Sequence, residues 1–179
     1  MHDDDLEPHP EPQPTFARPT LLNSCARAAT ASEARFRVPY ANSLPRVSSI
    51  IALDAASAAM MAAISEDPWK GARFLTLAQQ PDISPNEVLL TGPDGAGLRL
   101  TDELATTDLV VMIATESRAE KQAETIGRLA RGAAVMTAGI VVAGVDVEAV
   151  VQALRPNAAV LVIASDADYL PAMLTAMRA

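Results

Sequence analysis

Apolar runs alternate with helical patterns from Ser48 to the end of the chain, and this alternation constrains the fold more than any other feature. The runs are too continuously apolar to be half exposed, so we expect strands that are buried on both faces. Strands that alternate with helices in this way are typical of βαβ units and of a parallel sheet. The predicted strands are SSIIALD, ARFLTLA, DLVVMIAT, VMTAGIVVAG and AAVLVIAS.

The segments between these strands predict helices and one hairpin. ASAAMMAAISED has the composition of a helix, which we expect to end near Pro68 and Gly71. EVLLTGPDGAGLRL has two short apolar runs around GPDGAG, which indicates a hairpin or an irregular excursion rather than a helix. The further predicted helices are SRAEKQAETIGRLARG with a stop at Gly132, DVEAVVQALRP with Asp146 as its N-cap, and DADYLPAMLTAMRA. The chain therefore predicts an α/β domain with three layers, a Rossmann-like, mostly parallel sheet with helices on both faces.

The N-terminal part of the chain has a different composition from the rest. Residues 1–19 are acidic and rich in proline, and they lack the apolar content that would offset the entropy of ordering, so we expect disorder. Residues 20–47 predict a helical extension, and residues 48–179 predict a single α/β domain. Both histidines, His2 and His9, fall in the tail, so the predicted domain has no histidine for proton transfer or metal binding.

Charge and composition exclude several classes of function. The formal net charge of −8 disfavours nucleic-acid binding, which needs a basic surface. The arginines of RLAR, Arg128 and Arg131, predict a solvated helix face. No apolar run approaches the roughly 20 residues of a membrane span, and the acidic N-terminus does not resemble a secretory signal, so we expect a cytoplasmic protein. Cys25 is the single cysteine, which excludes an intrachain disulfide.

Candidate functional residues follow from the predicted sheet, because ligands of open parallel sheets bind beyond the carboxyl ends of the strands. This edge of the sheet is called the rim below. The polar candidates for a small-molecule or nucleotide site on it are Asp54, Gln79, Asp82, Thr115, Ser117, Arg118, Asp146, Asp166 and Asp168.

The loop after the first predicted strand lacks the residues that hold phosphate. A glycine-rich loop lets backbone N–H groups crowd an anion, whereas this loop reads LDAASA and has no glycine. Alanine costs roughly 1 kcal/mol or more in left-handed conformations, and Asp54 adds negative charge. No GxxxxGK[ST] motif occurs either. We therefore expect no GTP and no other cofactor at this site.

Two further rim segments have two interpretations each. In TESRAEKQ, Thr115 or Ser117 caps a helix with Glu120 completing a capping box, or Ser117 and Arg118 hold a small anion. In SDADYL, Ser165 or Asp166 caps the last helix, or Asp166 and Asp168 bind a metal with a diphosphate. The caps are the preferred interpretations. Nucleophilic catalysis has little support, because the serines of the rim have no histidine partner and no GxSxG motif occurs.

The order of these segments over about Ser48 to Leu170 resembles the nucleotide-binding half of the FtsZ/tubulin-like family of GTPases. SIIALDAASAAMMAAISEDPWKGARFLTLAQQPD has the layout of the family's first strand, GGGGxN loop, helix and GVEFIAVNTD strand. LLTGPDGAGLRLTDELATTDLVVMIATESRAEKQ matches the order of LTRGLGAG, ADMVFVTAG and GGTGTG. LRPNAAVLVIASDADYL is similar to the closing pattern LRKHVDTLIVIPNDRLL.

The departures from the family pattern concern the nucleotide. DAASA replaces the first glycine loop, and ESRAEKQ replaces the GGTGTG signature. We expect no counterpart of the family's activation domain after Leu170. The resemblance therefore implies degenerate phosphate-loop positions at Asp54, Ser57, Thr115, Ser117 and Arg118.

The sequence favours a non-catalytic domain that binds a protein partner, as an accessory, regulatory or assembly factor. An α/β enzyme or nucleotide-binding module with a remodelled rim is the alternative, and a self-assembling structural protein is a third. We expect no catalytic residue, no metal ligand, no nucleic-acid partner and no membrane association.

Overall fold

The protein is described by a computed structural model that covers residues 46–78, 88–142 and 146–179. The chain divides into two compact units between Ser43 and Leu44, and the first unit lies outside the described residues. The predicted tail and nearly all of the predicted helical extension therefore lie outside them too.

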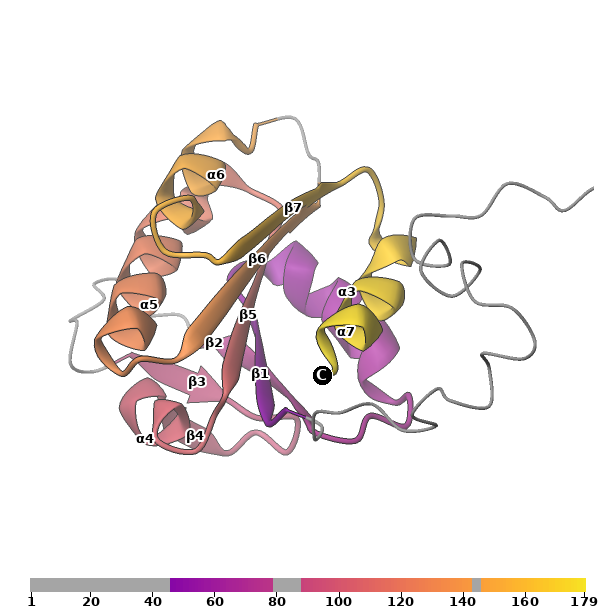
Figure 1. Cartoon of the computed structure of the whole chain (residues 1–179). Coiled ribbons are helices and arrows are strands. Elements are labelled where there is room, and N and C mark those ends of the chain that lie inside the picture. The colour runs from indigo at the N-terminus through magenta and orange to yellow at the C-terminus, as the bar shows by residue number, and fades with distance from the viewer. Residues whose placement is uncertain (1–45, 79–87, 143–145) are drawn as a thin grey trace, which may run out of the picture. The chain divides into compact units, whose positions relative to one another are not determined.

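Residues 48–164 of the second unit contribute a seven-stranded sheet in the order β4-β3-β2-β1-β5-β6-β7. β2, β1, β5, β6 and β7 run parallel, and β3 and β4 form an antiparallel hairpin at one edge (Figure 1). The prediction of an α/β fold with a mostly parallel sheet is confirmed, as is the hairpin. The strands are β1 Ser48–Ala52, β2 Ala72–Leu77, β3 Leu89–Thr91, β4 Gly97–Arg99, β5 Leu109–Ala114, β6 Met136–Val142 and β7 Val160–Ala164.

Helices cover both faces of the sheet. Figure 1 shows α4, α5 and α6 on one face and α3 and α7 on the other, and each face has its own cluster of buried apolar side chains. The helices are α3 Ala55–Ser65, α4 Leu100–Leu104, α5 Glu120–Gly132, α6 Glu148–Leu154 and α7 Leu170–Met177, with the 3₁₀ turns η1 Ser117–Ala119 and η2 Ala167–Tyr169.

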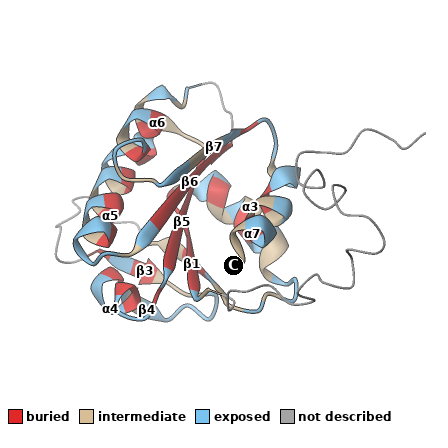
Figure 2. Cartoon of the chain, in the orientation of Figure 1, coloured by how far each residue is buried: buried red, intermediate tan, exposed pale blue. Residues whose placement is uncertain are grey.

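Burial is deepest in the middle of the sheet. Every residue of β1 and β5 is buried, whereas β7 at the edge is mostly half-buried or exposed (Figure 2). Unbroken aliphatic runs such as LVVMIA suit a position with helices on both faces, because every side chain then meets an apolar neighbour. The outer surface of α5 is solvated as predicted, since Arg128 and Arg131 are exposed.

The connections of the strands create a switch point between β1 and β5. From β1 the chain passes through α3 to β2 on one side, and from β5 it passes through α5 to β6 on the other side. Because α3 and α5 lie on opposite faces, they leave the sheet in opposite directions at this point (Figure 1). Ligands of open α/β sheets bind in the crevice that such a divergence creates.

The helix α4 was not predicted from the sequence. It has five residues and no side-chain hydrogen bond at its N-terminus, although Asp102 and Glu103 place acidic groups in its first turn. A helix this short forms through packing rather than through propensity, and the buried Leu100 and Leu104 supply that packing.

Candidate functional site

The rim at the switch point begins with Asp54, which follows β1 and is the N-cap of α3. Its carboxylate accepts a hydrogen bond from the backbone N–H of Ser57 at 2.7 Å. The Asp54 N–H donates in turn to the Ser57 hydroxyl at 3.1 Å, which completes a capping box. Ser57 is itself fully buried. The pair fixes the first turn of α3 and satisfies N–H groups that a helix N-terminus otherwise leaves open.

The same carboxylate reaches across to the neighbouring strand. Asp54 Oδ2 accepts from the Thr115 N–H at 2.7 Å, and Oδ1 accepts from the Thr115 hydroxyl at 2.8 Å. Just before this point, the Leu53 N–H donates to the Ile113 carbonyl at 2.9 Å, so the carboxylate continues the ladder between β1 and β5. Asp54 therefore closes the sheet at the switch point and positions Ser57 and Thr115 beside it.

These contacts favour the charged form of Asp54. Burial raises the pKa of its carboxyl group, but hydrogen bonds from Ser57 and Thr115 lower it by more. The net result is a pKa below the ordinary value of an aspartate. The switch point thus holds a fixed negative charge, bonded to N–H donors of the kind that bind phosphate in nucleotide sites.

The predicted site residues fall into two groups on this rim. Asp54, Ser57 and Thr115 are joined by hydrogen bonds as described above. Ser117 and Arg118 belong to η1 and border a hollow of about 370 Å³ that adjoins the first group through Thr115. Its lining comprises Thr115, Glu116, Ser117, Arg118 and Asp146.

The polar groups of this hollow pair largely with one another. The Ser117 hydroxyl donates to Asp146 Oδ1 at 3.1 Å, and the Ser117 N–H donates to the Asp146 carbonyl at 3.1 Å. Arg118 lies 3.3 Å from Glu116 in an ion pair that is largely exposed, so water screens most of its strength. The hollow combines two carboxylates with one arginine, which makes it a poor match for a polyphosphate.

The predicted caps hold only in part. Asp166 occupies the N-cap position of η2, as one of the two predicted candidates, but its side chain makes no capping hydrogen bond. The N-cap of η1 is Glu116 rather than Thr115 or Ser117, and its side chain makes no such bond either. Thr115 bonds to Asp54 instead, and Ser117 bonds to Asp146. These hydroxyls donate hydrogen bonds to residues of other segments, and a local sequence pattern does not reveal such long-range partners.

Asp146 is not the N-cap of α6 either, because Val147 occupies that position without a side-chain hydrogen bond. Asp168 lies with Asp166 beyond β7, and both are exposed. Within the described ranges, no group of three potential metal ligands comes together. The remaining rim candidates, Gln79 and Asp82, lie outside the described residues.

The ends of three parallel strands share a pattern that sequence reasoning missed. β1, β5 and β7 each finish in Ile-Ala, one further residue and then an acidic residue at an N-cap, namely Asp54, Glu116 and Asp166. The visible signal for the first was Asp-x-x-Ser directly after a strand, which is a variant of the capping-box sequence.

A buried polar cluster on α4 was also missed. Glu103 is only 3% exposed and pairs with Arg73 at 3.0 Å. The Ser49 hydroxyl donates to Glu103 at 2.5 Å, so the Thr107 hydroxyl donates to Ser49 at 2.7 Å. Arg73 and Glu103 also line an open hollow of about 320 Å³. Each of these polar groups has a partner, and the cluster anchors α4 to β1 and β2.

Comparison with known proteins adds no assignment to this geometry. The chain matches no protein-family model, and no curated protein matches its sequence. None of the helices in the described ranges is both long enough and apolar enough to cross a membrane. The function is therefore inferred from the site itself.

Proposed function

We propose that the protein is a non-catalytic α/β domain that acts by binding another protein, as an accessory, regulatory or assembly factor. The observation that carries this proposal is the Asp54 carboxylate at the switch point, which occupies the Ser57 and Thr115 donors. An incoming phosphate would have to displace a bonded carboxylate and lie beside its negative charge. A surface that has lost its anion site but keeps polar groups at its rim is suited to contacts with a protein.

A relationship to the FtsZ/tubulin-like family is part of this proposal. It is supported by the order of the sequence segments and by a parallel sheet whose first strand is central, between β2 and β5. In such a Rossmann-like arrangement the nucleotide loop would follow β1, where this chain has Asp54 and α3. The protein would then be a relative that retained the fold of the family and lost its nucleotide-binding site.

The non-catalytic part is tested with the purified full chain. Thermal-shift and calorimetric measurements with GTP, ATP and NAD(P), each with and without Mg²⁺, should show no binding, because ligand binding to the native state raises its stability. Phosphate release from GTP should equal the rate without protein. A micromolar dissociation constant for any of these nucleotides, or hydrolysis at an ordinary enzyme rate, would contradict the proposal.

The protein-binding part is tested on the rim. The full chain, cross-linked in its native host, should capture a partner whose yield falls when Glu116→Arg and Asp146→Arg are combined. Arg128→Glu is the matched control, because Arg128 is exposed on α5 and does not line the rim hollow. Equal recovery with the rim variant and the control would show that the rim is not the binding surface.

A second candidate function is binding of a small molecule in the rim hollow. The observation that favours it is the 370 Å³ space beside Ser117, Arg118 and Asp146, which is large enough for a small ligand. In the same thermal-shift screen, a rise of several degrees with one compound, abolished by Arg118→Ala, would favour this candidate over the first.

A further inference from the structure

The two edges of the sheet differ in how they are protected. β4 has three residues, including Gly97 and Arg99, and Arg99 pairs with Asp102 at 2.9 Å. Short strands and charges are the usual means by which proteins prevent edge-to-edge pairing. β7 at the opposite edge has the sequence VLVIA, without charge, proline or glycine. In the described part of the chain, β7 pairs with β6 alone.

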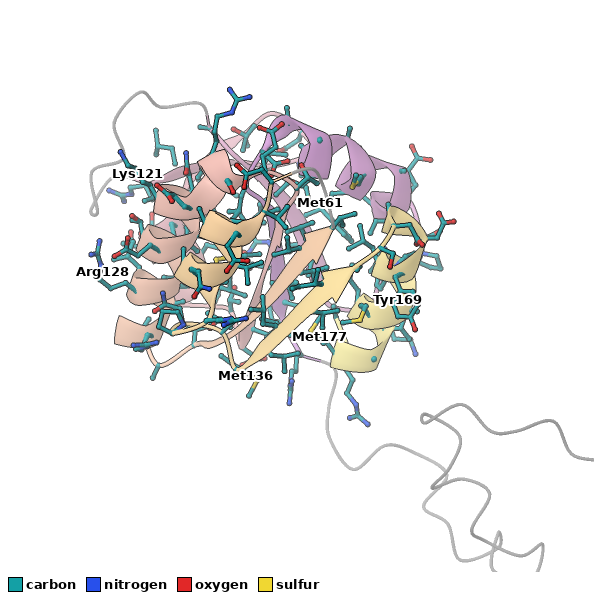
Figure 3. All side chains as sticks on the ribbon, turned by 90° about the horizontal axis from the view of Figure 1, so that it is seen from above. Met61, Lys121, Arg128, Met136, Tyr169 and Met177 are labelled. Atoms are coloured by element: carbon teal, nitrogen blue, oxygen red, sulfur yellow. The ribbon has the colours of Figure 1, made fainter. Side chains whose placement is uncertain are left out.

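The outer edge of β7 is apolar on both faces of the sheet. Val160 is 46% exposed and Ile163 is 56% exposed, and successive side chains of a strand point to opposite faces. Met136 and Tyr169, also largely exposed, lie near opposite ends of β7 (Figure 3). Among residues 46–78, 88–142 and 146–179, no strand pairs with the outer edge of β7, and the border of this edge is apolar. Its natural occupant is another strand that is apolar on both faces.

The charges at the ends of β7 indicate that the partner strand is a second copy of β7. Arg155 precedes β7 and is exposed, while Asp166 and Asp168 follow it and are exposed. A second β7 in antiparallel orientation would bring the basic end of each copy toward the acidic end of the other. A parallel copy would juxtapose like charges. Antiparallel pairing of two identical strands has two-fold symmetry, so the contact closes at a dimer.

We propose that the protein forms a two-fold homodimer in which the β7 strands of two copies pair antiparallel, centred near Val162, and join two sheets into one. The contact uses the main-chain groups of β7, the side chains of Val160 and Ile163, and the charges of Arg155, Asp166 and Asp168. It uses none of the residues that line the hollow beside Ser117 and Asp146, so it does not depend on the proposed function of the rim.

The first test is the solution mass of the full chain by light scattering and sedimentation. We expect twice 18.8 kDa, with a dissociation constant low enough for the dimer to dominate at about 100 µM. Ile163→Lys should weaken the dimer at least about tenfold, because it places a charge at the joined edge. Leu89→Lys is the matched control, since Leu89 is an exposed apolar residue of β3, which has strands on both sides. Its mass should equal that of the wild type.

The second test uses exposed charges and so does not threaten folding. Arg155→Glu and Asp166→Arg should each weaken the dimer, and the double variant should recover most of its strength. A wild type that is a monomer at about 100 µM would overturn the proposal. So would a dimer that Ile163→Lys leaves intact, or a double charge swap that is no stronger than the single variants. Slow hydrogen exchange of the β7 amides in a monomer would show that another segment of the same chain pairs with the outer edge of β7, which would also overturn the proposal.

Discussion

β1 and β7 end in the same pattern, Ile-Ala-x-Asp, yet the two aspartates have different surroundings. Asp54 follows a central strand and makes hydrogen bonds to Ser57 and Thr115. Asp166 follows an edge strand, is exposed, and makes no capping hydrogen bond. The difference lies in the neighbours: β1 lies beside β5, whose next residue supplies two donors, whereas β7 has a described strand on one side only.

The position of a strand in the sheet thus decides which contacts its terminal acidic residue makes. At the centre, the carboxylate is held by hydrogen bonds to Ser57 and Thr115 across the switch point. At the edge, the same residue type remains available to a partner. Two regions with the same local sequence thus support two proposals, a closed nucleotide site and an open dimer edge.

The largest effect on stability is expected from Asp54→Ala. The loss of the cap costs about 1 kcal/mol, and the loss of charged hydrogen bonds to Thr115 adds about 2 kcal/mol. Urea unfolding at low protein concentration should therefore show a free energy of unfolding lower by about 3 kcal/mol. Asp166→Ala is the matched control and should change it by less than about 0.5 kcal/mol. Equal losses of unfolding free energy for the two variants would contradict the proposed difference between the end of β1 and the end of β7.

A smaller loss is expected from Thr115→Val. The substitution keeps the shape and the N–H donor but removes the hydroxyl that bonds to Asp54 at 2.8 Å. The free energy of unfolding should fall by about 1 kcal/mol. Ser165→Ala, at the equivalent position after β7, should have almost no effect because Ser165 is exposed. An unaffected Thr115→Val would mean that the hydroxyl does not support the Asp54 carboxylate.

The pH dependence of stability should reveal the charged form of Asp54. Because the folded pKa of Asp54 is depressed, its contribution is complete above the unfolded value near pH 4 and is lost as pH falls through the folded pKa. The stability difference between wild type and Asp54→Asn should therefore shrink between about pH 5 and pH 2. A constant difference for Asp54→Asn would contradict the depressed pKa.

The sequence predicted the parallel strands and the hairpin because their signals are local. Unbroken aliphatic runs and the GPDGAG turn suffice for β5 and for the β3–β4 hairpin. The sequence also predicted that Asp54 and Thr115 lie at the rim, since the carboxyl ends of parallel strands share one edge of the sheet. The hydrogen bonds between them were not predicted, because they join residues 61 positions apart in the sequence.

Other failures have the same origin. Thr115 and Ser117 were expected to cap a helix, but each finds a better partner from another segment, Asp54 and Asp146 respectively. The short α4 forms through packing and through the pairing of Glu103 with Arg73. Local patterns specify where elements begin, whereas the partners of polar groups depend on which strands become neighbours.

The most direct test of the closed switch point is an NMR titration of the Asp54 carboxyl carbon together with the amide signals of Ser57 and Thr115. We expect a pKa for Asp54 below the ordinary value of an aspartate, and amide shifts of both residues that follow the same transition. An ordinary or raised pKa, or Ser57 and Thr115 amides that do not respond when Asp54 titrates, would contradict it.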